Sequence, residues 1–355
     1  MDKRPLIFIV ISAFLFGVSL PFAKLLVGNV SPVALAGLLY LGAFAGLSLF
    51  SVGRRIITTR IDKTSASLEK RDIPWLAGAI LVGGVIGPIS LMMGLTLVSG
   101  FSASLLLNLE TLTTIVIAVV FFKENAGKRV WLASACVIAA GIFLTWDPSQ
   151  GKFGTLGPLL IAFAMVCWGI DNNLTRNISG KDPILIAKIK GFVAGTISLL
   201  LAVTLGITIP LDIMIVAALL LGSFSYGISL VFFIRALEGL GSSRTGLLFS
   251  LAPFIGAITS LILLREWIGW VMFPAVGFMA AGVLLIITEK HSHLHFHKTI
   301  THIHLHYRDV HHRHRHAGAY DEPHAHEHLH LEESHIHAHW PDTHHRHDHR
   351  TSMGT

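Results

Sequence analysis

The stretch LLLNLETLTTIVIAVVFFKE, residues Leu105–Glu124, returns in altered form as LLFSLAPFIGAITSLILLRE, residues Leu247–Glu266. Each copy starts in a leucine-rich run, continues as an apolar segment and ends in a basic residue followed by glutamate. A transmembrane helix needs roughly 20 mostly apolar residues. Both copies meet that requirement, so the chain carries one membrane-spanning segment twice.

The repetition extends on both sides of this pair. The matched positions, first copy before second, are Gly17 with Gly169, Lys24 with Arg176, Leu95 with Leu237, Ser99 with Gly241, and the helix ends Ala139–Leu144 (AAGIFL) with Ala280–Leu285 (AAGVLL). Each copy holds five apolar spans, and an odd number inserts the second copy upside down. We therefore expect Glu124 to be cytoplasmic and Glu266 to be external. Inverted repeats are a hallmark of secondary transporters.

The composition is that of a chain dissolved in lipid. Its 355 residues include only 14% charged residues, and the mean hydropathy is +0.65, whereas a soluble domain must keep a charged surface. All 22 histidines lie between His291 and His349. The chain therefore consists of an apolar membrane body and a polar tail.

The predicted fold is an all-α integral membrane protein with ten transmembrane helices, arranged as two inverted five-helix repeats. The repeats cover residues 1–146 and 155–288, and a disordered histidine-rich tail covers residues 289–355. The predicted spans are residues 6–27, 33–53, 74–96, 99–121, 130–146, 155–176, 183–206, 211–236, 243–264 and 267–288.

The distribution of basic residues predicts the orientation. With the N-terminus inside, the cytoplasmic connections collect most of the lysines and arginines of the body. The outer side collects only Lys24, Lys152 and Arg265. Cytoplasmic loops carry an excess of Lys and Arg, so we expect both termini and the tail in the cytoplasm of a plasma-membrane protein.

Four segments of the chain resemble the EamA type of the drug/metabolite transporter superfamily. They are Phe14–Tyr40 (FLFGVSLPFAKLLVGNVSPVALAGLLY), Leu105–Glu124, Val137–Trp146 (VIAAGIFLTW) and Leu247–Glu266. The resemblance covers about residues 1–288 and implies ten helices and transport, often export, of small solutes without ATP hydrolysis. The family commonly has Glu-Pro where this chain has Glu110-Thr111 and Ala252-Pro253. The histidine-rich tail is not part of the general family pattern.

Glu110 is the leading candidate for a functional side chain. Ionisable groups inside membrane spans are costly, so each is a functional hypothesis by default. Glu110 lies near the middle of the fourth span beside Asn108. It is either a carboxylate that handles protons or substrate in a cavity, or a group that pairs with a neighbouring helix to fix packing.

A second polar group lies in the sixth span, at Asp171, Asn172 and Asn173. Three consecutive side chains cannot all face one way on a helix. This predicts either local unwinding around a polar cavity or a location near the cytoplasmic end where the side chains meet water. Lys188 and Lys190 of the next span are placed to neutralise Asp171.

Two further polar side chains lie in the predicted spans and have more ordinary explanations than substrate binding. Tyr226, in the eighth span, can donate a hydrogen bond to a solute, although helix packing explains it equally. Lys24 is expected to extend its ammonium group toward water at a helix end.

The tail has the composition of a metal-binding segment. Histidines alternate with other residues in four runs, and neutral imidazole is a good ligand for Zn, Ni, Co and Cu(II). The candidate ligands are His291, His293, His295, His297, His302, His304, His306, His324, His326, His328, His330, His335, His337 and His339. Low complexity and few core-forming residues predict a disordered tail when metal is absent. A polycation that responds to pH is the other interpretation.

The sequence favours a transporter over an enzyme. It contains neither a G-x-x-x-x-G-K-[ST] phosphate loop nor an H-E-x-x-H zinc motif. The first hypothesis is a secondary exporter of small metabolites with a tail that buffers or senses Zn, Ni or Co. The alternatives are a transporter of a divalent transition metal fed by the tail, and a membrane-anchored metal sensor or store. The expected partners are the bilayer and a small solute, without nucleic acid or a required cofactor; whether the chain forms a homodimer stays open.

Overall fold

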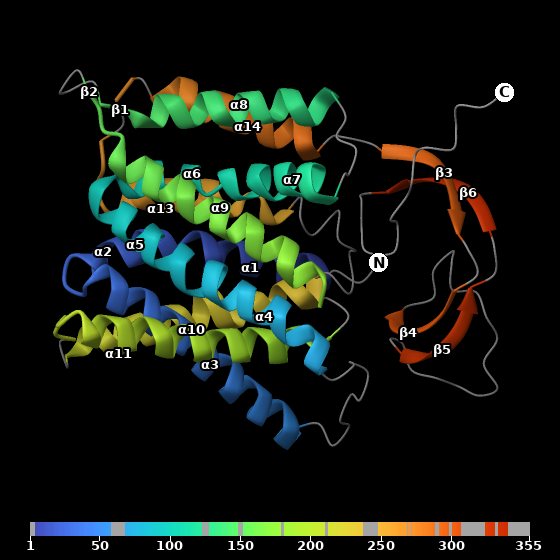
Figure 1. Ribbon diagram of the computed structural model, residues 1–355. Coiled ribbons are helices and arrows are strands. Elements are labelled where there is room, and N and C mark those ends of the chain that lie inside the picture. The colour runs from blue at the N-terminus through green and yellow to red at the C-terminus, as the bar shows by residue number, and fades with distance from the viewer. Residues whose placement is uncertain are drawn as a thin grey trace.

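The apolar runs of the sequence form a bundle of helices that lie side by side along a common direction (Figure 1). The computed structural model describes residues 4–57, 68–122, 128–147, 152–178, 181–209, 212–236, 248–267, 269–270, 272–287, 291–297, 300–306, 324–330 and 333–339. Every apolar run used to predict a span coincides with helix in these residues.

The helices of the first half follow the predicted order. They are α1 (Arg4–Gly17), α2 (Ser19–Val27), α3 (Pro32–Ile57), η1 (Lys70–Asp72), α4 (Ile73–Ala79), η2 (Ile80–Ile86), α5 (Gly87–Leu97), α6 (Gly100–Leu106), α7 (Leu109–Phe122) and α8 (Lys128–Thr145). A short hairpin of β1 (Trp146–Asp147) and β2 (Lys152–Phe153) joins the two halves. The second half contains α9 (Leu156–Arg176), α10 (Pro183–Thr204), α11 (Ile213–Gly222), η3 (Ser223–Ile228), α13 (Ala252–Leu263) and α14 (Met272–Ile287).

Within the described residues, seven helical segments are long and apolar enough to cross a membrane. Three shorter apolar helices, Trp131–Thr145, Ala252–Leu263 and Met272–Leu285, occupy the positions of the other predicted spans. The prediction of an all-α membrane protein is confirmed. The count of ten crossings stays a prediction.

The two halves share one core rather than forming separate lobes. Helix α3 of the first half packs against α10 and α11 of the second, α5 and α7 pack against α9, α6 against α13, and α8 against α14. The main apolar cluster accordingly includes buried residues from both halves, such as Leu35, Leu105, Ile161 and Met279. Burial of apolar surface therefore joins the halves along their full length.

Irregular helix geometry recurs at equivalent points of the two halves. The π-helical segments η2 and η3 lie in the third and eighth predicted spans, at nearly the offset that relates Glu124 to Glu266. The fourth span breaks between α6 and α7, and a turn at Ser250–Leu251 precedes α13 in the ninth. Helix breaks and π-bulges are frequent at functional sites. The structure thus repeats its irregularities as well as its sequence.

Four segments of the tail form strands, which corrects the prediction of disorder for those segments. Strand β3 (His291–His297) pairs with β6 (Glu333–His339), and β4 (Ile300–His306) pairs with β5 (His324–His330), both antiparallel. Isoleucine, leucine, phenylalanine and threonine alternate with the histidines, and this period of two suits a strand. The other tail residues lie outside the described ranges.

The predicted orientation can be tested at two exposed positions. With Cys136 and Cys167 replaced by alanine, single cysteines at Lys128 and Trp267 should react with a membrane-impermeant maleimide from opposite sides. Both native residues are exposed, so neither substitution removes core packing. A thiol at Lys128 should label only after the cytoplasmic side is made accessible. Labelling of both from one side would contradict the inverted repeat.

Candidate functional site

Glu110 lies where the fourth span is interrupted. Helix α6 ends at Leu106, and α7 begins at Leu109, so Glu110 occupies the first turn of α7. Negative charge is favoured at a helix N-terminus, where backbone N–H groups carry partial positive charge. Glu110 is partly exposed although it stands in the middle of its span. The break therefore places a partly exposed carboxylate in the middle of the fourth span.

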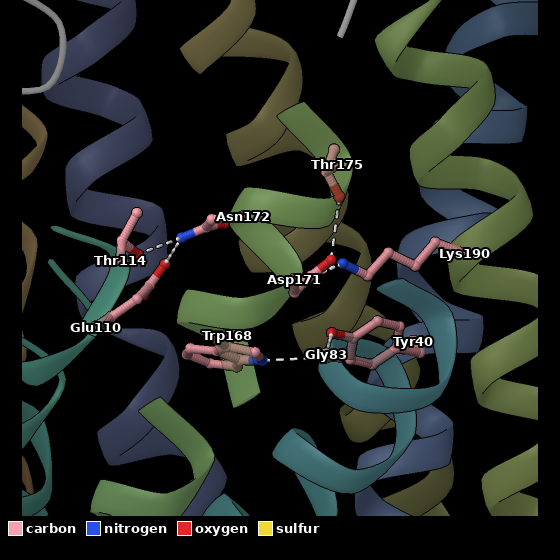
Figure 2. Close-up of polar contacts among 9 residues, drawn as sticks. All are labelled: Tyr40, Gly83, Glu110, Thr114, Trp168, Asp171, Asn172, Thr175 and Lys190. Atoms are coloured by element: carbon pink, nitrogen blue, oxygen red, sulfur yellow. Dashed lines mark hydrogen bonds and ion pairs between the residues drawn. The ribbon is translucent and has the colours of Figure 1, made fainter. Parts of the chain in front are cut away.

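The polar triplet in α9 contacts three different surroundings without unwinding the helix. Helix α9 is continuous from Leu156 to Arg176, so the prediction of local unwinding is wrong. Asp171 faces α10 and Asn172 faces the Glu110 carboxylate (Figure 2). Asn173 bonds to backbone oxygens. Successive positions are about 100° apart on a helix. The three side chains satisfy separate partners instead of sharing a cavity.

Asn172 links the two predicted polar groups. Its Nδ2 donates to Glu110 Oε1 at 2.9 Å and to Thr114 Oγ1 at 3.2 Å. Thr114 is one turn beyond Glu110 on α7, so both present oxygen atoms on the same face. Asn172 is exposed, and its partner carboxylate is partly exposed. This group of three side chains can exchange its hydrogen bonds for bonds to a bound molecule.

Asp171 forms a buried ion pair. Its Oδ2 bonds to Lys190 Nζ, and its Oδ1 accepts a hydrogen bond from Thr175 Oγ1 at 3.1 Å. Asp171 is 6% exposed. Gly83 makes room for it, because a Cβ at that position would overlap the Asp171 carboxylate. The pair neutralises Asp171, as the sequence predicts for one of its two lysines.

The carbonyl oxygen of Gly83 is held by two aromatic side chains. Tyr40 Oη donates to it at 3.0 Å and Trp168 Nε1 at 3.1 Å (Figure 2). Gly83 lies in η2, and a π turn alters the regular helical bonding that would otherwise occupy such an oxygen. These contacts fix the irregular segment beside the Asp171–Lys190 pair.

Tyr226 and Asn108 are placed next to the polar cluster rather than in it. Tyr226 lies in η3, with ring centroids 6.1 Å from Tyr40 and 6.0 Å from Phe16. Asn108 is buried at the break before Glu110, where its Nδ2 donates to Leu105 O at 3.1 Å. Asn108 thus bonds to the backbone beside the break, and the Tyr226 ring packs against Tyr40 and Phe16.

Four residues around the site are not among those predicted from the sequence: Thr114, Tyr40, Trp168 and Gly83. Thr114 is detectable, because a hydroxyl four residues after a carboxylate falls on the same helix face. Tyr40 and Trp168 carry polar atoms that need partners when buried, but the sequence does not say which partners. Their common partner depends on the geometry of η2.

The two carboxylates of this region differ in their counter-charges. Asp171 has Lys190, whereas no salt bridge joins Glu110 to a cation within the described part of the chain. Glu110 instead accepts a neutral hydrogen bond from Asn172. A carboxylate without a counter-charge can take up a proton or a cationic group of a solute. Asp171 suits a structural role and Glu110 a chemical one.

A separate ionic cluster lies at the end of the bundle that carries the start of α4. Lys181 Nζ is 2.7 Å from Glu69 Oε1 and 3.3 Å from Asp72 Oδ2. The hydrogen bond from Lys181 lowers the pKa of the Glu69 carboxyl, and the same contact raises the pKa of Lys181. Exposure of Glu69 makes this contact weak. It connects the halves at one end but is remote from the polar cluster.

The described residues from 4 to 287 contain no group of three or more His, Cys, Asp and Glu side chains arranged to hold a metal ion. The fourteen histidines predicted as ligands all lie in the tail strands β3 to β6.

Comparison with known proteins identifies relatives for the whole membrane body. The model of the EamA-like transporter family matches residues 3–146 and 155–288. An uncharacterized transporter of Methanothermobacter thermautotrophicus is 29% identical over 275 residues, which are 73% of this chain and 78% of that protein. The uncharacterized transporter YyaM of Bacillus subtilis is 25% identical over 285 residues, 76% of this chain and 87% of YyaM. One crystal structure of a protein matches with a TM-score of 0.57 at 16% identity, covering 80% of this chain and 96% of that one, and this likeness shows the fold.

The buried ion pair should be structural. Asp171→Asn or Lys190→Met leaves one charge unpaired, which should lower the free energy of unfolding by about 3–5 kcal/mol. The double variant removes both charges and should recover most of that loss. Lys188→Met, two residues away on α10, is the control and should change stability by less than about 1 kcal/mol. Unfolding in detergent, followed by circular dichroism, measures each variant. A double variant no better than the singles would contradict the assignment.

Proposed function

The chain belongs to the EamA-like transporter family, and we propose that it is a secondary exporter of small metabolites that hydrolyses no ATP. The two family domains and the transporter relatives support transport across a membrane. We further propose ten crossings of the plasma membrane with both termini in the cytoplasm. The match between the predicted spans and the observed helices supports that topology.

The observation that carries this proposal is the partly exposed Glu110 carboxylate, which has no cationic partner among the described residues, at the break of the fourth span. Its side-chain partner is the neutral amide of Asn172. The carboxylate can therefore bind a proton, or accept a hydrogen bond from a donor group of a solute in place of the amide. Solute and proton then compete for one group. That competition couples export of the solute to entry of a proton.

The repeated irregularities support movement between two states. Breaks in the fourth and ninth spans, and π segments in the third and eighth, stand at equivalent points of the two halves. In an inverted repeat, exchanging the conformations of the halves turns a site open to one side into a site open to the other. Glu110 is close to these irregular segments and can face either side in turn.

Glu110→Gln tests this mechanism. Glutamine keeps the bond with Asn172 but cannot exchange a proton, so solute-driven proton movement in proteoliposomes should fall at least about tenfold while the protein stays folded. Glu69→Gln removes a carboxylate outside the cluster and should leave coupling intact. Cellular solute profiling would first identify exported compounds. Full proton coupling in Glu110→Gln would assign Glu110 to packing instead.

We propose a second, separate function for the tail: it binds Zn, Ni or Co as a cytoplasmic buffer or sensor. The strand registers support this proposal. They set His293 opposite His337 and His304 opposite His326, with further facing pairs two residues along each strand. Facing residues share one side of a ladder, and two adjacent pairs offer four imidazoles, the number that tetrahedral Zn uses. The alternatives are that the metal is cargo, or that the tail is a store attached to a body that does not transport.

Truncation after Glu289 separates these possibilities. Full-length protein should bind several equivalents of Zn near pH 7 and release them toward pH 5, because protons and metal compete for imidazole. If metal is a signal, the truncated protein should export metabolites without responding to added metal. If metal is cargo, truncation should lower metal flux at low metal concentration. Equal behaviour of both proteins in both assays would leave only passive storage.

A paired substitution tests the proposed ligand geometry. His293→Gln with His337→Gln removes one facing pair and should weaken Zn binding more than His345→Gln with His347→Gln. The second variant removes the same number of imidazoles from residues outside the described strands. Isothermal titration of the full-length protein measures both. Equal losses would contradict metal binding across paired strands.

A further inference from the structure

The junction between α5 and α6 is held by two opposite charges from distant parts of the chain. Helix α5 ends at Leu97, and α6 begins at Gly100, with Val98 and Ser99 between them. Ser99 caps α6 by accepting a hydrogen bond from Ser102 N at 3.0 Å. Two carbonyl oxygens and two N–H groups of the backbone near this junction bond to side chains of α2 and of the segment after α13.

Lys24 binds the carbonyl end of α5. Its Nζ donates to Leu95 O at 2.5 Å and to Val98 O at 2.7 Å. The last carbonyl oxygens of a helix have no partner within the helix and carry partial negative charge. The structure therefore corrects the expectation that Lys24 merely extends toward water.

Glu266 binds the amide end of α6. Its Oε1 accepts from Gly100 N at 2.6 Å, and its Oε2 accepts from Phe101 N at 2.8 Å. The first N–H groups of a helix lack internal partners and attract negative charge. Lys24 and Glu266, which carry opposite charges, thus bind the two sides of the same junction. Lys24 fastens the end of α5 to α2 within the first repeat. Glu266 joins the second repeat to the start of α6 in the first.

The backbone before Glu266 adopts an uncommon conformation. Arg265 has φ of 50°, in the left-handed region that glycine normally occupies after a helix. This turn follows the end of α13 and directs Glu266 back onto α6. Gly100 permits the approach, since a Cβ at that position would lie 2.7 Å from Leu264 Cδ1 and 2.8 Å from Ser260 Oγ.

This junction lies at the end of the bundle predicted to face outward. Trp267 and Trp270 follow Glu266 and are 92% and 75% exposed, as expected for tryptophans at a membrane–water interface. Ser260, directly below the junction, is fully buried. Meanwhile, Asn172 and Glu110 in the polar cluster keep exposure. Ser260 is therefore fully covered in this structure, whereas Asn172 and Glu110 are not.

We propose that Lys24 and Glu266 form a latch that closes the outer end of the transporter and releases once in each transport cycle. Glu266 joins α6 of one repeat to the segment after α13 of the other, and Lys24 holds the neighbouring end of α5 against α2. The latch can therefore hold only while α6 and the segment after α13 stay together. Opening separates α6 from α13 and exposes Ser260. This inference rests on the proposed transport function but is measured without any solute.

A thiol introduced by Ser260→Cys reports the latch in full-length protein in nanodiscs. Cys136 is replaced by alanine, and native Cys167, which is 3% exposed, remains as a second reporter. Ser260 Oγ has no hydrogen-bond partner among the described residues, so the substitution removes no hydrogen bond. Labelling by a charged methanethiosulfonate should be slow in this parent protein. Adding Glu266→Gln or Lys24→Met should speed labelling of the introduced thiol at least tenfold, because each variant removes one of the two charges.

Two control variants and the second thiol make the result decisive. Arg265→Gly relieves the left-handed conformation without touching either charge, and Glu69→Gln removes an acid elsewhere; both should label like the parent. The labelling rate of Cys167 should stay constant throughout. Equal acceleration of both thiols would mean general loosening and would overturn the latch. Unchanged labelling of the introduced thiol in both charge variants would overturn it as well, whatever Glu110→Gln does to transport. If Glu266→Gln does not fold, Lys24→Met alone decides.

Discussion

The lipid interior leaves charged side chains and backbone polar groups no water to bond with, so each of these needs an internal partner. The ion pair between Asp171 and Lys190 is the strongest expression of this constraint. It joins α9 to α10, and Gly83 in η2 leaves the space that the aspartate occupies. The π geometry of η2 and the bonds of Tyr40 and Trp168 to Gly83 follow from the same local packing. One charge pair therefore organises the third, sixth and seventh spans around the candidate site.

The same constraint separates structural from functional charges. Asp171, Lys24 and Glu266 have partners of opposite sign or polarity that satisfy them fully. Glu110 has a neutral amide and a hydroxyl-bearing neighbour, and it remains partly exposed. The partners of a charged side chain, rather than its residue type, decide whether it serves structure or transport. A charge whose partners are fixed stabilises one conformation. An unsatisfied charge needs a proton or ligand that comes and goes.

Much of the fold is predictable because hydrophobic length and repetition are properties of the sequence itself. The positions of the spans, the two repeats and the prominence of Glu110 all follow from patterns of residue type. Predictions fail where partners decide the structure. Residues 171–173 suggest unwinding, but three neighbours allow a regular helix. Lys24 suggests a side chain in water, whereas its partners are carbonyl oxygens more than seventy residues away. In the tail, low complexity suggests disorder, but the alternation of side chains also suits paired strands.

The inverted repeat explains why sequence symmetry and chemical asymmetry coexist. Glu124 matches Glu266 by sequence, but Ala252 stands in the second copy where the first has Glu110. The symmetric positions lie at span ends, where an equivalent contact is useful in each of two opposite states. The asymmetric position lies at the break in the middle, where a single site serves both states. One central carboxylate between repeated span ends therefore fits the alternating access proposed above.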